Sequence, residues 1–221
     1  MGIVIAVASG KGGTGKTSVT GGVAAALAMA GQRVLCIDMD IGLRNLDISL
    51  GLSDRALMDF ADVALGRCTL SRAAVRHPDL KELSLLTAPM SLPPSLSPYR
   101  VRSMLSAART LYDYILIDAP AGLGPGFQYA VCGADRALVV ATNDASSLRD
   151  AQRVVAELDW LPQVHLVMNR IQPKLLRKLR TTIDDAMNTA GLPLIGVIPE
   201  DAQVMLCANR GIPLTSQGRK G

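Results

Sequence analysis

The chain has 221 residues, of which 49% are hydrophobic and 3% aromatic, so it is long enough and apolar enough to form one α/β domain. Its four cysteines are widely separated and form no C-x-x-C pair, which argues against a disulfide framework or a zinc ribbon and favours reduced thiols. The formal charge is +4, but the basic residues are scattered, so nucleic-acid binding is favoured only weakly.

Apolar strands and helical segments alternate along the chain, a pattern typical of a mostly parallel, twisted sheet with helices on both faces. We predict about seven strands, at residues 3–8, 33–37, 83–87, 114–118, 137–141, 163–168 and 194–198. We predict helices at residues 17–30, 56–65, 98–111, 126–132, 146–158, 173–190 and 202–209. Because we find neither a signal peptide nor an apolar run of membrane-spanning length, we expect a cytoplasmic protein.

Residues 10–17 read Gly-Lys-Gly-Gly-Thr-Gly-Lys-Thr and meet the pattern G-x-x-x-x-G-K-[ST] of a phosphate-binding loop. An apolar strand precedes the motif and a helix follows it, which is the required context. In such a loop backbone N–H groups surround the phosphates, Lys16 neutralises them and the Thr17 hydroxyl binds Mg²⁺. We therefore predict a single-domain P-loop NTPase that binds its nucleotide through Gly10, Lys11, Gly12, Gly13, Thr14, Gly15, Lys16, Thr17 and Ser18.

Three acidic residues follow or end predicted strands. Asp38 and Asp40 come after the strand at 33–37, and Asp118 ends an apolar strand in the manner of a Walker B motif. Because ligands bind beyond the carboxyl ends of the strands in open α/β sheets, these acids should lie near the phosphates. We predict that Thr17, Asp38 and Asp118 serve the metal and that Asp40 orients the attacking water. The alternative is that the acids only cap turns.

Five segments together carry a resemblance to a known family: residues 10–17, 38–47, 118–122, 146–150 and 196–201. With them the chain resembles the MinD/ParA family of deviant Walker A ATPases from residue 1 to about residue 214, and the run 41–47 favours the MinD branch. The resemblance implies ATP and Mg²⁺ as ligands. It also implies a homodimer in which Lys11 reaches the partner's phosphates, so that Lys11, Lys16 and Asp40 are the expected catalytic residues.

The resemblance further implies that Asn169 contacts adenine, with Pro199 and Asp201 beside the ring. It implies an ATP-dependent dimerisation switch in division-site placement, with MinC and with MinE or a topological factor as partners. The MinD branch continues past the position of Leu214 into an amphipathic membrane helix. Residues 216–221 have no apolar face, so we expect that helix to be absent and peripheral membrane association to be in doubt.

Two other readings stay open on the sequence alone. A ParA-like DNA-partition ATPase is favoured by the basic charge, and DNA binding over a salt series would distinguish it. An iron–sulfur carrier of the same superfamily would need cysteines that meet at a dimer axis. The basic, amphipathic segment 174–187 could lie on a membrane or on DNA, although a helix that covers the sheet explains it better. Residues 142–145 read Thr-Asn-Asp-Ala where the MinD branch usually has a Thr-Pro-Glu segment, a difference that could change local partner contacts.

Overall fold

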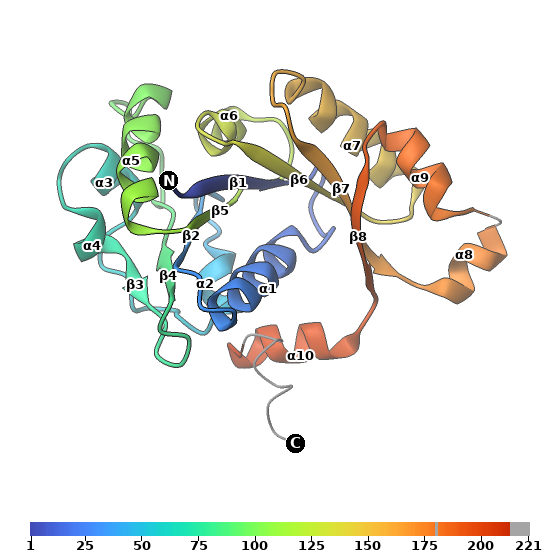
Figure 1. Cartoon of the computed structure of the whole chain (residues 1–221), viewed down its shortest axis with the longest axis horizontal. Coiled ribbons are helices and arrows are strands. Elements are labelled where there is room, and N and C mark those ends of the chain that lie inside the picture. The colour runs from blue at the N-terminus through green and yellow to red at the C-terminus, as the bar shows by residue number, and fades with distance from the viewer. Residues whose placement is uncertain (180, 213–221) are drawn as a thin grey trace.

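The computed structural model describes residues 1–179 and 181–212. Within these residues the chain forms an eight-stranded sheet with the order β3-β4-β2-β5-β1-β6-β7-β8 (Figure 1). Neighbouring strands run parallel, except that β3 is antiparallel to β4. The strands are β1 (Ile3–Ala8), β2 (Val34–Asp38), β3 (Val75–Arg76), β4 (Leu83–Leu86), β5 (Tyr114–Asp118), β6 (Arg136–Ala141), β7 (Val164–Ile171) and β8 (Leu194–Pro199).

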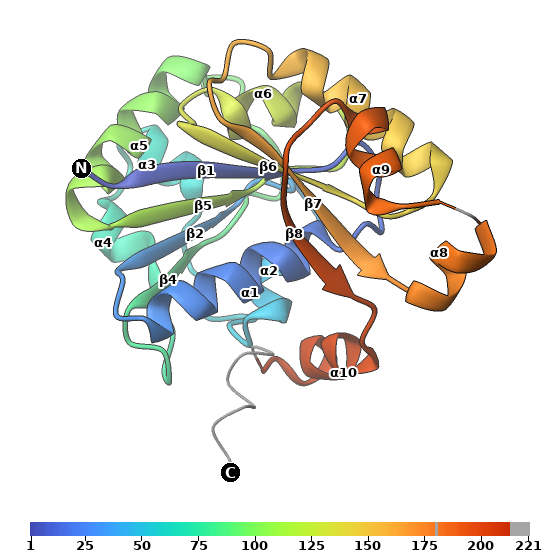
Figure 2. The ribbon, with the colours of Figure 1, turned by 45° about the vertical axis from the view of Figure 1, so that its right-hand side comes forward.

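Helices cover both faces of the sheet, as Figure 2 shows, with α1, α2 and α10 on one side and α5, α6 and α7 on the other. In the described part of the chain the helices are α1 (Lys16–Met29), α2 (Asn45–Ser49), α3 (Phe60–Ala64), α4 (Leu70–Ala73), α5 (Pro98–Leu111), α6 (Pro125–Val131), α7 (Ala145–Glu157), α8 (Pro173–Leu179), α9 (Ile183–Ala190) and α10 (Ala202–Arg210). The predicted single-domain α/β fold is confirmed.

The core lies on both sides of the central strands because these strands are mostly apolar, although β2 and β5 end in the buried Asp38 and Asp118. Every residue of β2 is buried. Ile37 belongs to the apolar cluster beneath α5 and α6, whereas Cys36 belongs to the cluster beneath α1. Buried alanines of α1, including Ala24 and Ala28, allow that helix to pack closely on the sheet.

The seven predicted strands are present with small shifts at their ends, and the eighth, β3, was not predicted. β3 is only two residues long, too short for a pattern of alternating burial, and it forms through its pairing with β4. The predicted helix 173–190 is instead two helices. Thr182 begins α9 with a capping box, because its hydroxyl accepts from the Asp185 N–H at 3.1 Å while the Asp185 carboxylate accepts from the Thr182 N–H at 2.7 Å.

The predicted helix 56–65 was too long at its start, because Asp59 caps α3 through the N–H groups of Ala61 and Asp62. The helices α2 and α4 were missed, since each is one turn long. None of the helices within residues 1–179 and 181–212 is long and apolar enough to cross a membrane. The expectation about a missing membrane helix concerns residues 214–221, which lie outside the described residues.

Strand order places the predicted catalytic motifs together. β1 lies between β5 and β6, and β2 lies on the other side of β5. Asp118 is in register with Asp38 on β2 and with Val7 on β1, so the acids and the loop that follows β1 meet at the carboxyl edge of the sheet. This edge is where ligands bind in open parallel sheets.

Candidate nucleotide-binding site

The loop between β1 and α1 is shaped by its glycines. Gly13 has a φ of 81° and Gly15 a φ of 85°, in the left-handed region that favours glycine. Gly15 is the N-cap of α1, and a Cβ atom there would lie 2.2 Å from Nδ2 of Asn169. No other residue type fits at Gly15 without displacing Asn169.

Polar groups in this loop and in the first turn of α1 fit a phosphate group. The Thr14 Oγ1 atom is buried and has no hydrogen-bond partner within the described residues. A buried hydroxyl without a partner costs free energy that a ligand oxygen would recover. The loop also precedes a 14-residue helix whose first turn contains no acidic residue, and the positive end of its dipole favours an anion at the loop.

A buried charged cluster lies directly beneath this loop. The Lys16 ammonium donates to Asp118 Oδ1 at 2.7 Å, and both side chains are buried. The Thr17 hydroxyl donates to Asp118 Oδ2 at 2.7 Å, and the Thr20 hydroxyl lies 3.2 Å from Oδ1. The structure thus brings together the predicted phosphate lysine and two of the three predicted metal residues. Hydroxyl and carboxylate oxygens are ligands that Mg²⁺ binds, so Thr17 and Asp118 could together hold the ion.

Asp38, the third predicted metal residue, is engaged with the loop that follows β2. Its Oδ1 accepts from the Asp40 N–H at 2.9 Å, and its Oδ2 accepts from the Leu46 N–H at 3.1 Å. Burial and the neighbouring Asp118 charge raise the pKa of Asp38 to about 7. Asp38 therefore holds the backbone of the loop after β2, a supporting role that its position in the sequence did not reveal. A role near the metal stays a prediction.

Asp40 is half-buried beside the charged cluster. Burial raises the pKa of its carboxyl group, the Lys16 charge opposes this shift and the Asp118 charge adds to it. Its carbonyl oxygen accepts from Leu43 and Arg44, so the backbone around it is fixed. The charges of the predicted phosphate-binding lysine and of Asp118 thus both act on the predicted water-orienting residue.

A cavity of about 680 Å³ extends from the phosphate-binding loop to α10. Gly13 and Ser18 line it, and so do the predicted adenine contacts Asn169, Pro199 and Asp201. Apolar side chains of α1, β8 and α10 line much of the rest, together with Ser49, Leu50, Arg170 and Glu200. The cavity therefore joins the two groups of residues that the sequence assigned to phosphate and base, which are more than 150 residues apart.

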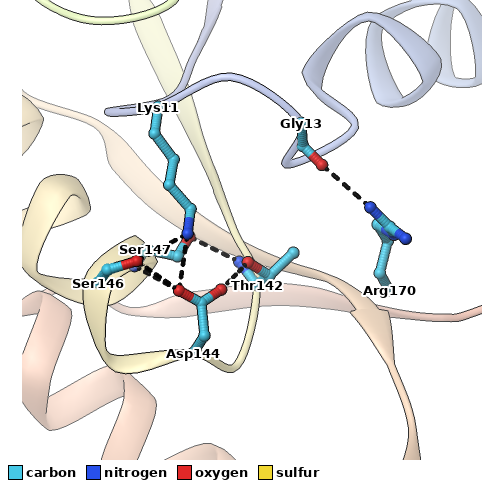
Figure 3. A network of polar contacts seen from close by, with 7 residues as sticks. All are labelled: Lys11, Gly13, Thr142, Asp144, Ser146, Ser147 and Arg170. Carbon is cyan, nitrogen blue, oxygen red and sulfur yellow. Dashed lines mark hydrogen bonds and ion pairs between the residues drawn. The ribbon is translucent and has the colours of Figure 1, made fainter.

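Two side chains at the end of β7 hold the carbonyl groups of the phosphate-binding loop. Asn169 Nδ2 donates to the Thr14 carbonyl at 2.8 Å. Arg170 Nη1 donates to the Gly13 carbonyl at 3.2 Å (Figure 3). Arg170 also pairs with Glu200 at 2.8 Å and has a φ of 57°. Asn169 was predicted only as a base contact, and Arg170 was missed because no local pattern marks it.

Comparisons with known proteins give the family. The model of the CobQ/CobB/MinD/ParA nucleotide binding domain matches residues 5–214. The chain belongs to this family. The septum site-determining protein MinD of Helicobacter pylori is 41% identical over 225 residues, which cover 97% of this chain and 84% of the relative.

Two solved structures of MinD proteins agree with the family assignment. MinD in the MinC:MinD cell division protein complex of Aquifex aeolicus is 36% identical with a TM-score of 0.90, covering 98% of this chain and 89% of that one. MinD of Pyrococcus horikoshii, solved with Mg-ADP, is 29% identical with a TM-score of 0.85, covering 100% of this chain and 90% of that one. These relatives confirm the predicted family and favour its MinD branch.

The second lysine that marks this MinD/ParA-family loop points away from the phosphate cradle. The Lys11 ammonium donates to Asp144 Oδ1 at 2.7 Å and to Ser146 Oγ at 2.8 Å, at the start of α7 (Figure 3). The Lys11 side chain is 34% exposed. The structure places Lys11 within its own subunit, and its predicted role toward a partner's phosphates stays a prediction.

The iron–sulfur reading finds no support in the positions of the cysteines. Cys36 is fully buried in β2 and Cys207 is buried on α10, on the side of the sheet that α1 covers. Cys68 and Cys132 are partly buried against the opposite core cluster. Cysteines distributed in this way do not face one surface that two subunits could share.

Replacing Asp38 with asparagine should stabilise the protein increasingly as the pH rises. The folded-state pKa of about 7 exceeds the value of about 3.9 in an unfolded chain, so ionisation favours the unfolded state from about pH 4 to about pH 7. The difference in the free energy of unfolding between Asp38→Asn and the parent should shift by about 2–3 kcal/mol in the variant's favour between pH 5 and pH 8. Guanidinium denaturation at both pH values measures it, with the exposed Glu157→Gln as the control for a lost charge. A pH-independent difference would contradict the raised pKa.

Proposed function

We propose that this chain is a MinD-type ATPase that binds Mg-ATP, dimerises in the ATP state and hydrolyses ATP to leave that state. The observation that supports it most directly is the arrangement of the two loop lysines. Lys16 is buried in the cradle with Asp118, whereas Lys11 lies at the surface with its ammonium outside the cradle. One lysine is thus placed for the chain's own nucleotide, and the other is accessible to a second subunit.

Within one subunit each site residue has a proposed role that follows from its position. Lys16 and the loop N–H groups hold the phosphates, and Asn169 and Arg170 fix the loop by binding the Thr14 and Gly13 carbonyls. Thr17 and Asp118 would hold Mg²⁺, which neutralises phosphate charge when bound. Asp40 would orient the attacking water, a role supported by its raised pKa and by its place just after β2 at the carboxyl edge of the sheet.

Dimerisation through the carboxyl edge of the sheet is supported by apolar side chains around the site. Leu43 is 65% exposed, Met90 69% and Leu123 38%. The loops of Leu43 and Met90 are joined to each other, because the Gly42 N–H donates to the Pro89 carbonyl. The loop of Leu123 is joined to the start of the phosphate-binding loop, because the Gly122 N–H donates to the Ser9 carbonyl. Exposed apolar groups on connected loops are typical of a surface that a partner covers.

A role in division-site placement follows from the relatives. The Helicobacter relative is named a septum site-determining protein, and the Aquifex relative was solved in complex with MinC. We infer that the ATP dimer of this chain binds MinC, and that MinE or a topological factor stimulates its turnover. Peripheral membrane association belongs to the same proposal. Retention of the cognate MinC by the immobilised chain with a non-hydrolysable ATP analogue, and its loss with ADP, would test the assignment; retention independent of nucleotide would contradict it.

Lys11→Ala should retain ATP binding but lose ATP-dependent dimerisation and turnover. Its ammonium lies outside its own cradle, so affinity for ATP in the monomer should change by less than about threefold, whereas charge stabilisation across the interface is removed. Calorimetry measures the affinity, and light scattering measures the dimer. Lys178→Ala, which removes an exposed lysine of α8, is the matched control and should behave like the parent. ATP hydrolysis by Lys11→Ala at the parent's rate would contradict the proposal that Lys11 acts on the partner's nucleotide.

A further inference from the structure

Asp144 is the centre of a hydrogen-bond network at the start of α7 (Figure 3). Its Oδ1 accepts from the Lys11 ammonium at 2.7 Å, from the Ser146 hydroxyl at 2.7 Å and from the Ser147 N–H at 2.9 Å. Its Oδ2 accepts from the Thr142 hydroxyl at 2.6 Å. The carboxylate therefore caps α7 and binds the Lys11 ammonium at the same time.

The donors around Asp144 fix it in its ionised form. Burial alone would raise its pKa, but the hydrogen bonds from Lys11, Thr142, Ser146 and the Ser147 N–H together hold the pKa well below its usual range. At neutral pH the contact with Lys11 is thus an ion pair. Because half of the Asp144 side chain is exposed, solvent weakens the pair and its release is feasible.

The phosphate-binding loop contacts α7 at a second point beside this ion pair. A Cβ atom on Gly10 would lie 2.4 Å from the Asp150 carbonyl oxygen and 2.5 Å from the Asp150 Cβ. The first residue of the loop therefore packs against the backbone of α7, and the next residue binds the cap of the same helix. Two adjacent contacts make α7 the element on which the position of Lys11 depends.

The Asp144 carboxylate and a phosphate compete for the Lys11 ammonium. If the ammonium bound a phosphate oxygen while it kept Asp144 at 2.7 Å, two anionic groups would share one cation at close range. The carboxylate would repel the phosphate and cancel part of the charge that Lys11 brings. Lys11 can serve a partner's nucleotide fully only after it leaves Asp144.

We propose that Asp144 is a positioning residue that retains Lys11 within its own subunit, and that release of this ion pair opposes formation of the ATP dimer. The proposal rests on the proposed function, because the released lysine needs a partner's phosphate as its recipient. The free energy lost when Lys11 leaves Asp144 must be offset by the contacts that Lys11 makes with ATP in the dimer. In the ADP state those contacts are incomplete, so the protein stays monomeric. In this account the Lys11 ammonium exchanges the Asp144 carboxylate for a phosphate oxygen of the partner's nucleotide.

The variant Asp144→Asn tests this, because the amide oxygen can still cap α7 while the negative charge is lost. With a non-hydrolysable ATP analogue and Mg²⁺, the dissociation constant of the dimer should fall about four- to twentyfold. This range is the square of a gain of about two- to four-and-a-half-fold for each of the two lysines released. A purely structural defect at α7 would move the constant in the opposite direction. Glu157→Gln removes a carboxylate from the far end of α7 and should leave the constant unchanged.

Chemical labelling tests the monomer separately. In ADP, an amine-reactive reagent should modify Lys11 at least about twofold faster in Asp144→Asn than in the parent, as measured by mass spectrometry of the Lys11 peptide. Faster labelling with a tighter dimer supports the proposal. If the parent dimerises with the analogue but Asp144→Asn forms an equally weak or weaker dimer, the proposal is overturned. Labelling of Lys11 at the parent's rate in Asp144→Asn also overturns it. If the parent itself stays monomeric with the analogue, the proposed function fails, while faster labelling would still show that Asp144 retains Lys11.

Discussion

Lys16→Ala should abolish measurable ATP binding, with affinity reduced by at least about a hundredfold. The Lys16 ammonium is the buried cation of the cradle, and its partner Asp118 is fully buried. Removing it takes away the strongest charge contact for the phosphates and leaves Asp118 without its cation. The second effect should destabilise the fold by about 3–5 kcal/mol.

Calorimetry measures the loss of binding, and thermal unfolding separates it from the loss of stability. The double variant Lys16→Gln with Asp118→Asn replaces the ion pair by a neutral pair that can still form a hydrogen bond. It should recover most of the stability without recovering ATP binding. Near-normal ATP affinity in Lys16→Ala would overturn the assignment of the phosphate-binding loop.

Asp40→Ala should bind ATP but hydrolyse it about a hundredfold or more slowly. Its carboxylate has no hydrogen-bonded side-chain partner in the described part of the chain, and its charge environment is set by Lys16 and Asp118. The lost interaction would therefore affect mainly the transition state, so binding should survive. Because hydrolysis is the route out of the ATP state, this variant should accumulate as a dimer.

Single-turnover kinetics with Mg-ATP measures the chemical step of Asp40→Ala without interference from product release. Asp54→Asn is the matched control, since it removes an exposed carboxylate from the loop after α2 and asparagine tolerates the φ of 60° found there. The control should hydrolyse ATP at the parent's rate. If Asp40→Ala also hydrolyses ATP at the parent's rate, Asp40 is a turn residue and another residue must orient the attacking water.

The parts of this fold that could be predicted are those that local sequence determines. Strands buried on both faces are mostly apolar, and the phosphate-binding loop needs glycine at fixed positions. For this reason β1, β2, β5 and the loop could be recognised from short segments. β3 could not, because two residues carry no periodicity. The division between α8 and α9 depends on the Thr182 cap, a local signal that the helical pattern of the surrounding residues obscured.

The contacts that complete the site could not be predicted because they join residues that are distant in sequence. Lys11 and Asp144 are 133 positions apart, and Arg170 and Gly13 are 157 positions apart. An aspartate before a helix predicts an N-cap and gives no sign that a lysine of another loop shares the carboxylate. Likewise, Asp38 was predicted as a metal residue from its place after a strand, whereas its hydrogen bonds to Asp40 and Leu46 became apparent only in the folded chain.

The dependence of molecular mass on nucleotide tests the proposed switch most directly. Size-exclusion chromatography with light scattering should give the monomer mass of 23.3 kDa for the parent in Mg-ADP. With Mg and a non-hydrolysable ATP analogue it should give twice that mass, and Asp40→Ala should give the same dimer in Mg-ATP itself. A parent that stays monomeric in the ATP state, or one that is equally dimeric in ADP, would contradict an ATP-dependent dimerisation switch.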